Sequence, residues 1–208
     1  MRDVPTTQMK VIEAIRNGLD VAMDLDPHLI CYGLGIDDPK RIFGSTVGLA
    51  EKFGNGRVFD VPTSEAAMTG IAVGAALRGV RSVTVHQRLD FFFLAMDQLI
   101  NNVAKWHFMF GGQRSVPIVI RLILGRGWGQ GPTHSQSVHS WFAHIPGLKV
   151  VMPTNAADAK GVICAAKNEG RHEKSLEIAR KMLSSGFSFD QVVQMTGLSE
   201  KDIKSLQG

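Results

Sequence analysis

Apolar side chains recur along the chain with two alternating spacings, one helical and one extended. The first helical pattern begins at Thr6 or Thr7, either of which suits an N-cap, and ends at Asp26-Pro27. Short apolar runs between turn-forming residues are typical of buried strands. Such runs predict strands over residues 28–32, 58–61, 82–85, 117–121 and 149–152. Further helical patterns cover residues 64–77, 90–105 and 155–167.

This alternation predicts an α/β fold with a mainly parallel sheet flanked by helices. The pattern changes after Gly170, because all eight prolines lie at or before Pro153 and only short helical patterns follow. These cover about residues 172–185, 188–195 and 199–206, and serines at 188 and 199 suit their N-caps. We therefore expect one domain over residues 1–170 and a small all-α tail over residues 171–208.

Composition narrows the class of protein. The chain has 208 residues, of which 44% are apolar and 20% charged, as is usual for a soluble globular protein. Its net charge of +4 is not concentrated in a basic run, so we do not expect nucleic-acid binding. The tail nevertheless has the length of a helix-turn-helix interaction module. No long apolar run or signal peptide predicts membrane association. Cys31 and Cys164 lie far apart among apolar residues, which favours reduced thiols and a cytoplasmic location.

Glu65 is the first candidate for chemistry. It falls in the first turn of a predicted helix directly after a strand, where the helix dipole alone would explain a carboxylate. Residues 69–76 are almost all small, however, and such a helix allows close approach of a neighbouring element. A carboxyl group at a tightly packed interface is partly desolvated, which makes Glu65 a candidate proton donor or acceptor.

Two further segments follow predicted strands. Phe91, Phe92 and Phe93 cannot all share one helix face, so at least one ring is free to stack on a flat ligand or a partner subunit. The glycine-rich stretch 125–136 lacks the Lys-Ser/Thr ending of a phosphate-binding loop, and we interpret it as an active-site loop that presents His134 and Gln136. His134 alone is also compatible with a structural role. The spacing of the histidines at 134, 139 and 144 does not suit a metal site, and we predict none.

Several motifs in order resemble one family, the beta subunits of the pyruvate and branched-chain 2-oxo-acid dehydrogenase decarboxylases, relatives of the transketolase pyrimidine-binding domain. The resemblance covers about residues 8–169. The motifs are Gly-Leu-Ala-Glu-Lys-Phe-Gly at 48–54, Arg-Val-Phe-Asp-Val-Pro-Thr-Ser-Glu at 57–65, Asp-Gln-Leu-Ile-Asn-Asn-Val-Ala-Lys at 97–105, Val-Pro-Ile-Val-Ile-Arg at 116–121, His-Ser-Gln at 134–136, Pro-Gly-Leu-Lys-Val-Val-Met-Pro at 146–153 and Asp-Ala-Lys-Gly at 158–161.

The resemblance implies roles for four residues. Glu65 would hydrogen-bond the aminopyrimidine ring of thiamine diphosphate and promote the tautomer that activates the cofactor, as a catalytic and cofactor-binding residue. Phe91 would place its ring against the aminopyrimidine, with Gln87 near the same ring. His134 would be a second catalytic residue, which acts in acyl transfer. The family also carries Gly-Glu-Asp after its first strand, whereas this chain has Gly33-Leu34-Gly35.

The resemblance further implies a shared cofactor. Thiamine diphosphate would lie between this chain and an alpha-type subunit that holds the diphosphate and Mg²⁺, in a homo- or hetero-oligomer that acts on a small 2-oxo acid. The family continues beyond the region of residue 170 with a further strand and a second domain, so we expect the pyrimidine-binding domain here to be incomplete at that edge. The tail resembles the C-terminal segment of Rpn-like transposase-associated nucleases. The alternative is a catalytically inactive truncated or fused remnant that acts at most in oligomerisation or interaction.

Overall fold

Four parallel strands form the centre of the molecule. The computed structural model describes residues 8–36, 41–125, 129–186, 188–196 and 198–206, with the side chains of residues 41–42, 166–174 and 177 excepted. The strand order is β2-β1-β3-β4, and every neighbouring pair is parallel. The predicted α/β class with a parallel sheet is therefore confirmed. The strands are β1 (Ile30–Gly33), β2 (Val58–Asp60), β3 (Ser82–Val85) and β4 (Ile118–Arg121).

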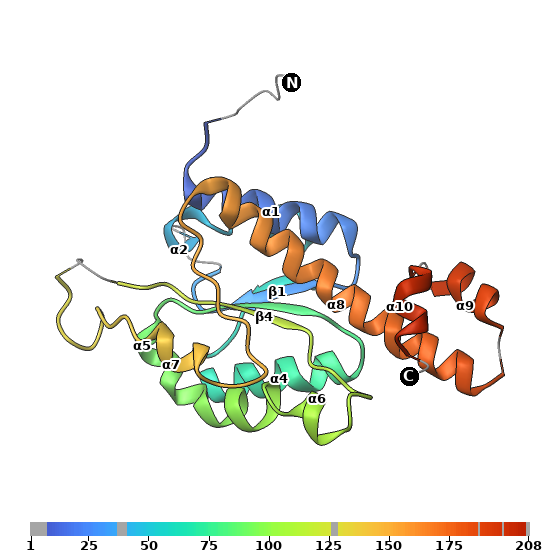
Figure 1. The fold of residues 1–208 in the computed structure, drawn as a ribbon. Helices are drawn as coiled ribbons and strands as arrows, with labels where there is room; N and C mark the ends of the chain where they lie inside the picture. The colour runs from blue at the N-terminus through green and yellow to red at the C-terminus, as the bar shows by residue number, and fades with distance from the viewer. Residues whose placement is uncertain (1–7, 37–40, 126–128, 187, 197, 207–208) are drawn as a thin grey trace.

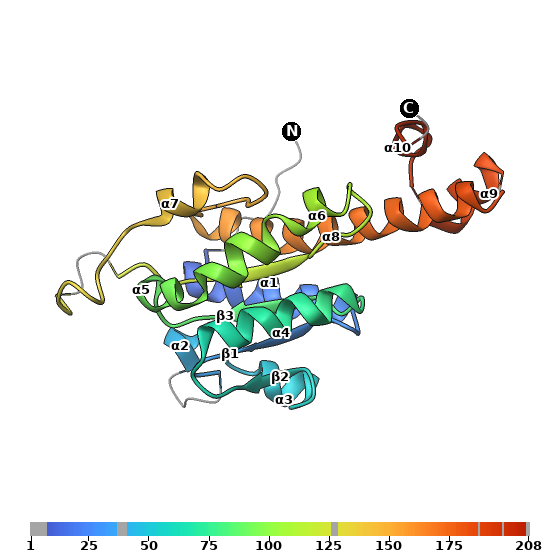
Figure 2. The same ribbon diagram turned by 90° about the horizontal axis from the view of Figure 1, so that it is seen from below.

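Helices cover both faces of the sheet (Figures 1 and 2). Helices α1 (Val11–Leu25) and α8 (Ala156–Ser184) pack side by side on one face, while α4 (Glu65–Leu77) packs on the other. Strand β1 alternates between them, because Cys31 faces the α1 side and Tyr32 contacts Met68 of α4. The other helical segments are α2 (Arg41–Gly44), α3 (Leu49–Phe53), α5 (Leu89–Phe92), η1 (Phe93–Ala95), η2 (Gln98–Val103), α6 (Trp106–Met109), α7 (His139–Ala143), α9 (Phe189–Thr196) and α10 (Glu200–Lys204).

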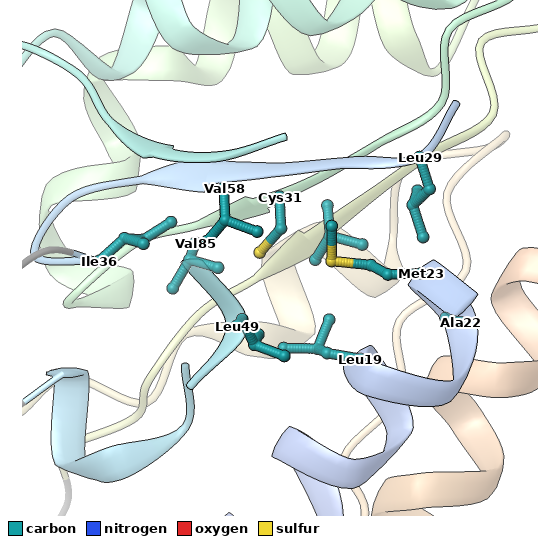
Figure 3. Packing of buried hydrophobic residues seen from close by; sticks show 10 residues of the cluster. Leu19, Ala22, Met23, Leu29, Cys31, Ile36, Leu49, Val58 and Val85 are labelled. Atoms are coloured by element: carbon teal, nitrogen blue, oxygen red, sulfur yellow. The ribbon is translucent and has the colours of Figure 1, made fainter. Parts of the chain in front are cut away.

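The largest cluster of buried apolar side chains fills the space between the sheet and α1 (Figure 3). Cys31 is fully buried in this cluster, and burial raises the pKa of its thiol to about 12. Such a thiol stays protonated and behaves as a small apolar side chain. The cluster consists of Leu19, Ala22, Met23, Leu29, Cys31, Ile36, Leu49, Val58, Val83 and Val85.

Arg57 fixes the end of α1 against the sheet. Its guanidinium donates hydrogen bonds to the carbonyl oxygens of Met23, Asp26 and Leu29 at 2.7–3.1 Å. These carbonyls belong to the last turn of α1 and the loop after it, so Arg57 satisfies acceptors that have no partner within the helix. The predicted stop at Asp26 agrees with the observed end at Leu25, whereas the helix begins at Val11. The proposed N-caps at residues 6 and 7 lie outside the described residues.

Two predicted elements differ in the structure. The expected helix over residues 90–105 is helical but is not one regular α-helix, because α5 passes into the 3-10 segment η1 and then into the π-helical segment η2. The expected strand over residues 149–152 is wrong, since this segment is irregular and Val151 is 56% exposed. An apolar run marks an extended segment, but a strand also needs a hydrogen-bonded neighbour, which periodicity does not reveal.

The C-terminal residues form a small helical unit with its own core, at the far end of α8 from α2 (Figure 1). Ala179 from α8, Val192 from α9 and Ile203 from α10 are each fully buried in it. A reciprocal capping box between Ser199 and Asp202 starts α10. Helix α8 runs without interruption through Gly170, so the boundary there stays a prediction. None of the helices in the described part of the chain combines the length and apolar character needed to span a bilayer.

Candidate functional site

A pocket of about 390 Å³ lies at the carboxyl ends of β1, β2 and β3. The chain passes from β1 to β2 on one side and returns to β3 on the other, so β1 and β3 form the point where the strand order reverses. Open parallel sheets bind ligands at this point. The lining residues are Leu34, Gly35, Asp60, Val61, Thr63, Glu65, His86, Gln87, Arg88, Phe91 and Leu94.

Glu65 reaches the pocket from the first turn of α4 and is only 5% exposed. The helix is fixed behind it, because the Tyr32 hydroxyl of β1 donates a 2.7 Å hydrogen bond to the carbonyl oxygen of Met68. The Thr69 hydroxyl donates to the Glu65 carbonyl oxygen at 2.9 Å. The structure thus places one shielded carboxyl group at the pocket.

The three consecutive phenylalanines take three different directions. Phe91 lines the pocket and is 39% exposed, whereas Phe92 is 1% exposed in the core and Phe93 packs against Trp141. The Phe91 ring meets the imidazole of His134 edge to face, with centroids 5.1 Å apart. Phe91 is therefore the ring with a face available to a ligand, and His134 borders the pocket through it.

Asp90 connects the segment that carries His134 to α5. Its Oδ1 atom accepts a 3.0 Å hydrogen bond from the Gln136 backbone N–H, and Asp90 is 6% exposed. The cap position of α5 is Arg88, so Asp90 does not cap this helix. Asp90 instead holds His134 and Gln136 near the pocket. Residues 126–128 of the glycine-rich stretch lie outside the described residues.

His86 lines the pocket and was missed in the sequence analysis. It is 1% exposed, and neither ring nitrogen has a hydrogen-bond partner within the described part of the chain. Burial lowers the pKa of His86 to about 4, so the imidazole is neutral at neutral pH. The available signal was the run of polar residues at alternate positions, Ser82, Thr84 and His86, in and directly after a strand expected to be buried.

The wall formed by β1 and β2 also departs from the family motif. Leu34 and Gly35 line the pocket where the family has a carboxylate. Asp60, at the end of β2, accepts a 2.7 Å hydrogen bond from the Ile36 backbone N–H and so joins the two strand ends. Over the described residues, no group of three or more His, Cys, Asp or Glu side chains is arranged to bind a metal ion.

Comparison with known proteins agrees with this geometry. Residues 7–181 match the family described as the transketolase pyrimidine-binding domain. Residues 172–208 match the C-terminal HTH domain of the Rpn/YhgA-like nuclease family, so the two matches overlap within α8. The resemblances expected for the main domain and for the tail are both confirmed.

Among similar curated proteins are beta subunits of the pyruvate dehydrogenase E1 component. Subunit beta-2 of Oryza sativa subsp. japonica is 39% identical over 191 residues, which covers 87% of this chain and 51% of that protein. The Bos taurus and Homo sapiens subunits are each 40% identical over 159 residues, covering 76% of this chain and 44% of theirs. The chain thus spans about half the length of these relatives.

The expected cytoplasmic location is contradicted by these comparisons, because the similar subunits are named as mitochondrial proteins. The fold and the family agree with each other. The sheet is entirely parallel with helices on both faces, and its pocket lies at the reversal of strand order. With a match from residue 7 to residue 181, this chain belongs to the transketolase pyrimidine-binding domain family.

Proposed function

We propose that this chain is the beta-type half of a thiamine-diphosphate-dependent 2-oxo-acid dehydrogenase component, which binds the aminopyrimidine ring and acts with an alpha-type subunit. The observation that carries the proposal is the convergence of Glu65, Gln87 and Phe91 on one pocket. Glu65 comes from the motif that ends in the first turn of α4, whereas Gln87 and Phe91 come from the segment after β3. The similar curated proteins are beta subunits of this class.

The pocket suits a flat heteroaromatic ring. Phe91 offers an exposed aromatic face, and Glu65 offers a shielded carboxyl group that can share a proton with a ring nitrogen. The pocket suits a diphosphate less well, because its lining holds two carboxyl side chains, Asp60 and Glu65, and a single Lys or Arg side chain, Arg88. Mg²⁺ bound to a diphosphate needs oxygen ligands that we assign to the alpha-type partner.

Each residue then has a separate task in the proposed reaction. Thiamine diphosphate, when bound, supplies the electron sink that decarboxylation of a 2-oxo acid requires. Glu65 binds the ring edge and moves a proton at its carboxyl oxygen, and Phe91 orients the ring by stacking. Gln87 lies at the same wall and contributes an amide hydrogen bond. His134, held beside Phe91, exchanges a proton during acyl transfer.

Calorimetric titration tests the proposal. Thiamine diphosphate with Mg²⁺ is titrated into the chain alone and into its mixture with an alpha-type subunit from the same genome. Binding only in the mixture would support the shared site, whereas absence of binding in both would overturn it.

Glu65→Gln tests the proton-transfer role, since the amide has nearly the size of the carboxyl group but cannot donate or accept a proton as an acid or a base. We expect loss of turnover in the mixture with an unchanged circular dichroism spectrum. Glu51→Gln on α3 is the matched control, because Glu51 is exposed and does not line the pocket. Full turnover by Glu65→Gln would remove Glu65 from the mechanism.

A second candidate is a non-catalytic protein that acts through its surface. It is favoured by the match of residues 172–208 to an unrelated family and by exposed apolar side chains such as Phe108, which is 86% exposed. This candidate predicts no thiamine-diphosphate-dependent turnover with any partner. It also predicts a particle heavier than the 22.7 kDa chain in light scattering, which a monodisperse monomer would contradict.

A further inference from the structure

Strand β4 is an edge of the sheet, because it pairs with β3 on one side and ends the strand order β2-β1-β3-β4. The apolar run that contains it continues to Leu124, and residues 118–124 are all half-buried. All four residues of β3, by contrast, are buried. An edge of this kind offers backbone hydrogen-bonding groups and apolar surface to a further strand.

The chain does not complete this edge with a strand of its own over the described residues. Residues 149–152 cross on the outer side of β4 (Figures 1 and 2), but they form no strand. Their apolar side chains remain largely in solvent, since Val151 is 56% and Met152 49% exposed. No strand pairing therefore has to be broken when another strand adds to β4.

Arg121 is the charged residue in this apolar run. It lies on the α1 side of β4, because Val119 and Ile123, two positions before and after it, both pack against the cluster between the sheet and α1. The side chain is half-buried, and its Nη1 atom is enclosed without a hydrogen-bond partner. Burial lowers the pKa of Arg121 to about 10, and within the described part of the chain the Cys31 thiol, not a carboxylate, is the ionisable group that acts on it. The guanidinium is thus a partly desolvated cation without an ion pair.

A charge on an edge strand opposes indiscriminate pairing. A purely apolar strand beside β4 would remove Arg121 from its remaining water, and no new interaction would offset that cost. A second copy of β4 would bring another Arg121 and no carboxylate, because residues 116–125 contain neither Asp nor Glu. A strand with a carboxylate beside Arg121 escapes this cost, since a charge-assisted hydrogen bond compensates the desolvation. The charge therefore selects an acidic strand.

We propose that the outer edge of β4 is a docking site for an extended segment of a partner protein, which carries an Asp or Glu beside Arg121. Side chains that share a face on neighbouring strands have β-carbons about 5 Å apart, within reach of an Arg–carboxylate pair. The apolar residues of the segment would cover Val119 and Ile123. Residues 118–124 do not line the pocket, so the inference does not depend on the proposed function.

The experiment uses the full ¹⁵N-labelled chain and the peptide acetyl-Lys-Val-Thr-Glu-Thr-Val-Lys-amide as probe. Its glutamate has a valine two positions away on each side, to match Val119 and Ile123 around Arg121. We expect the backbone amides of residues 118–124 to shift on titration and to exchange their hydrogens more slowly. The peptide with Gln in place of Glu should bind roughly tenfold more weakly, the effect of one lost charge-assisted hydrogen bond.

Two variants separate the ion pair from general charge effects. Arg121→Gln should bind both peptides with equal affinity, because the cation that distinguishes them is removed. Arg78→Gln is the matched control, since it removes the same charge from an exposed residue at the end of α4 and should keep the preference for the acidic peptide. If Arg121→Gln fails to fold, the comparison of the two peptides on the wild type still decides.

The outcomes also identify other occupants of the edge. Equal affinity of the wild type for the two peptides, or unmoved amides of residues 118–124 at millimolar peptide, would overturn the proposal. Light scattering and hydrogen exchange of the chain without peptide complete the test. A concentration-dependent dimer with slowed exchange at residues 118–124 would assign the edge to a second copy and would equally overturn it.

Discussion

Acidification should destabilise this protein through His86. Burial lowers the pKa of its imidazole from the ordinary value of 6.5 to about 4. Between these pH values the unfolded chain binds a proton that the folded protein does not. Because the folded-state pKa is the lower one, this contribution to stability is complete above pH 6.5, declines as the pH falls, and is lost near pH 4.

The expected magnitude follows from the size of the shift. One pKa unit corresponds to about 1.4 kcal/mol, so a fall from 6.5 to about 4 represents about 3 kcal/mol in total, of which about 2 kcal/mol is lost by pH 5. A domain of this size has a free energy of unfolding of roughly 5–15 kcal/mol. The loss is therefore large enough to measure by equilibrium unfolding.

Urea unfolding followed by circular dichroism at about pH 7 and about pH 5 gives the comparison. His86→Phe keeps an aromatic ring beside Phe92 and does not titrate, so other groups cancel in the difference between the two proteins. The free energy of unfolding of the wild type should fall by about 2 kcal/mol more than that of the variant. Parallel decreases would refute the conclusion that the imidazole is shielded from water.

Three further outcomes are expected. Asp90→Ala should lower the free energy of unfolding by about 1–3 kcal/mol, because it removes the acceptor of the Gln136 N–H. Limited proteolysis should also cut residues 129–138 faster than in the wild type, and an unchanged cleavage rate would contradict the anchoring role. Arg57→Ala should lower the free energy of unfolding in urea by about 2–3 kcal/mol, since the carbonyl oxygens of Met23 and Leu29 lose the guanidinium donor and that of Asp26 keeps only the Leu29 N–H, and Arg57→Lys should recover little. Val192→Asp should unfold α9 and α10, because it places a charge in the core of the C-terminal unit, and the helical ellipticity should fall. The thermal transition of the sheet domain should stay at the same temperature, whereas a single shifted transition would show that the two units unfold together.

The sequence carried enough information for the sheet and for most of the proposed ligand contacts. The short apolar runs that became strands lie between turn residues, and those of β1 and β3 are buried on both faces, so apolar runs and turn residues were sufficient. Glu65 was identified because it follows a strand at the start of a small-residue helix, whereas Gln87 and Phe91 were assigned through the family resemblance, and all three line the pocket.

Other features depend on long-range packing and could not be predicted locally. The helical segment after β3 changes from α to 3-10 to π geometry in α5, η1 and η2, and the spacing of apolar residues does not reveal these changes. His86 comes directly after a short strand, and only its packing against Phe92 in the folded chain shows that its ring is enclosed. The segment at residues 149–152 has the composition of a strand but no paired neighbour.

The number of residues in helix α8 sets how the C-terminal unit is rotated about the helix axis relative to the sheet domain. Its 29 residues run from the face of the sheet into the unit formed with α9 and α10, without a loop between them (Figure 2). Each residue of an α-helix advances the axis by about 1.5 Å and turns it by about 100°. A single-residue insertion near residue 170 would therefore rotate α9 and α10 by about a quarter-turn around the axis of α8. A partner bound to the surface of α9 and α10 would then face a different side of the sheet domain.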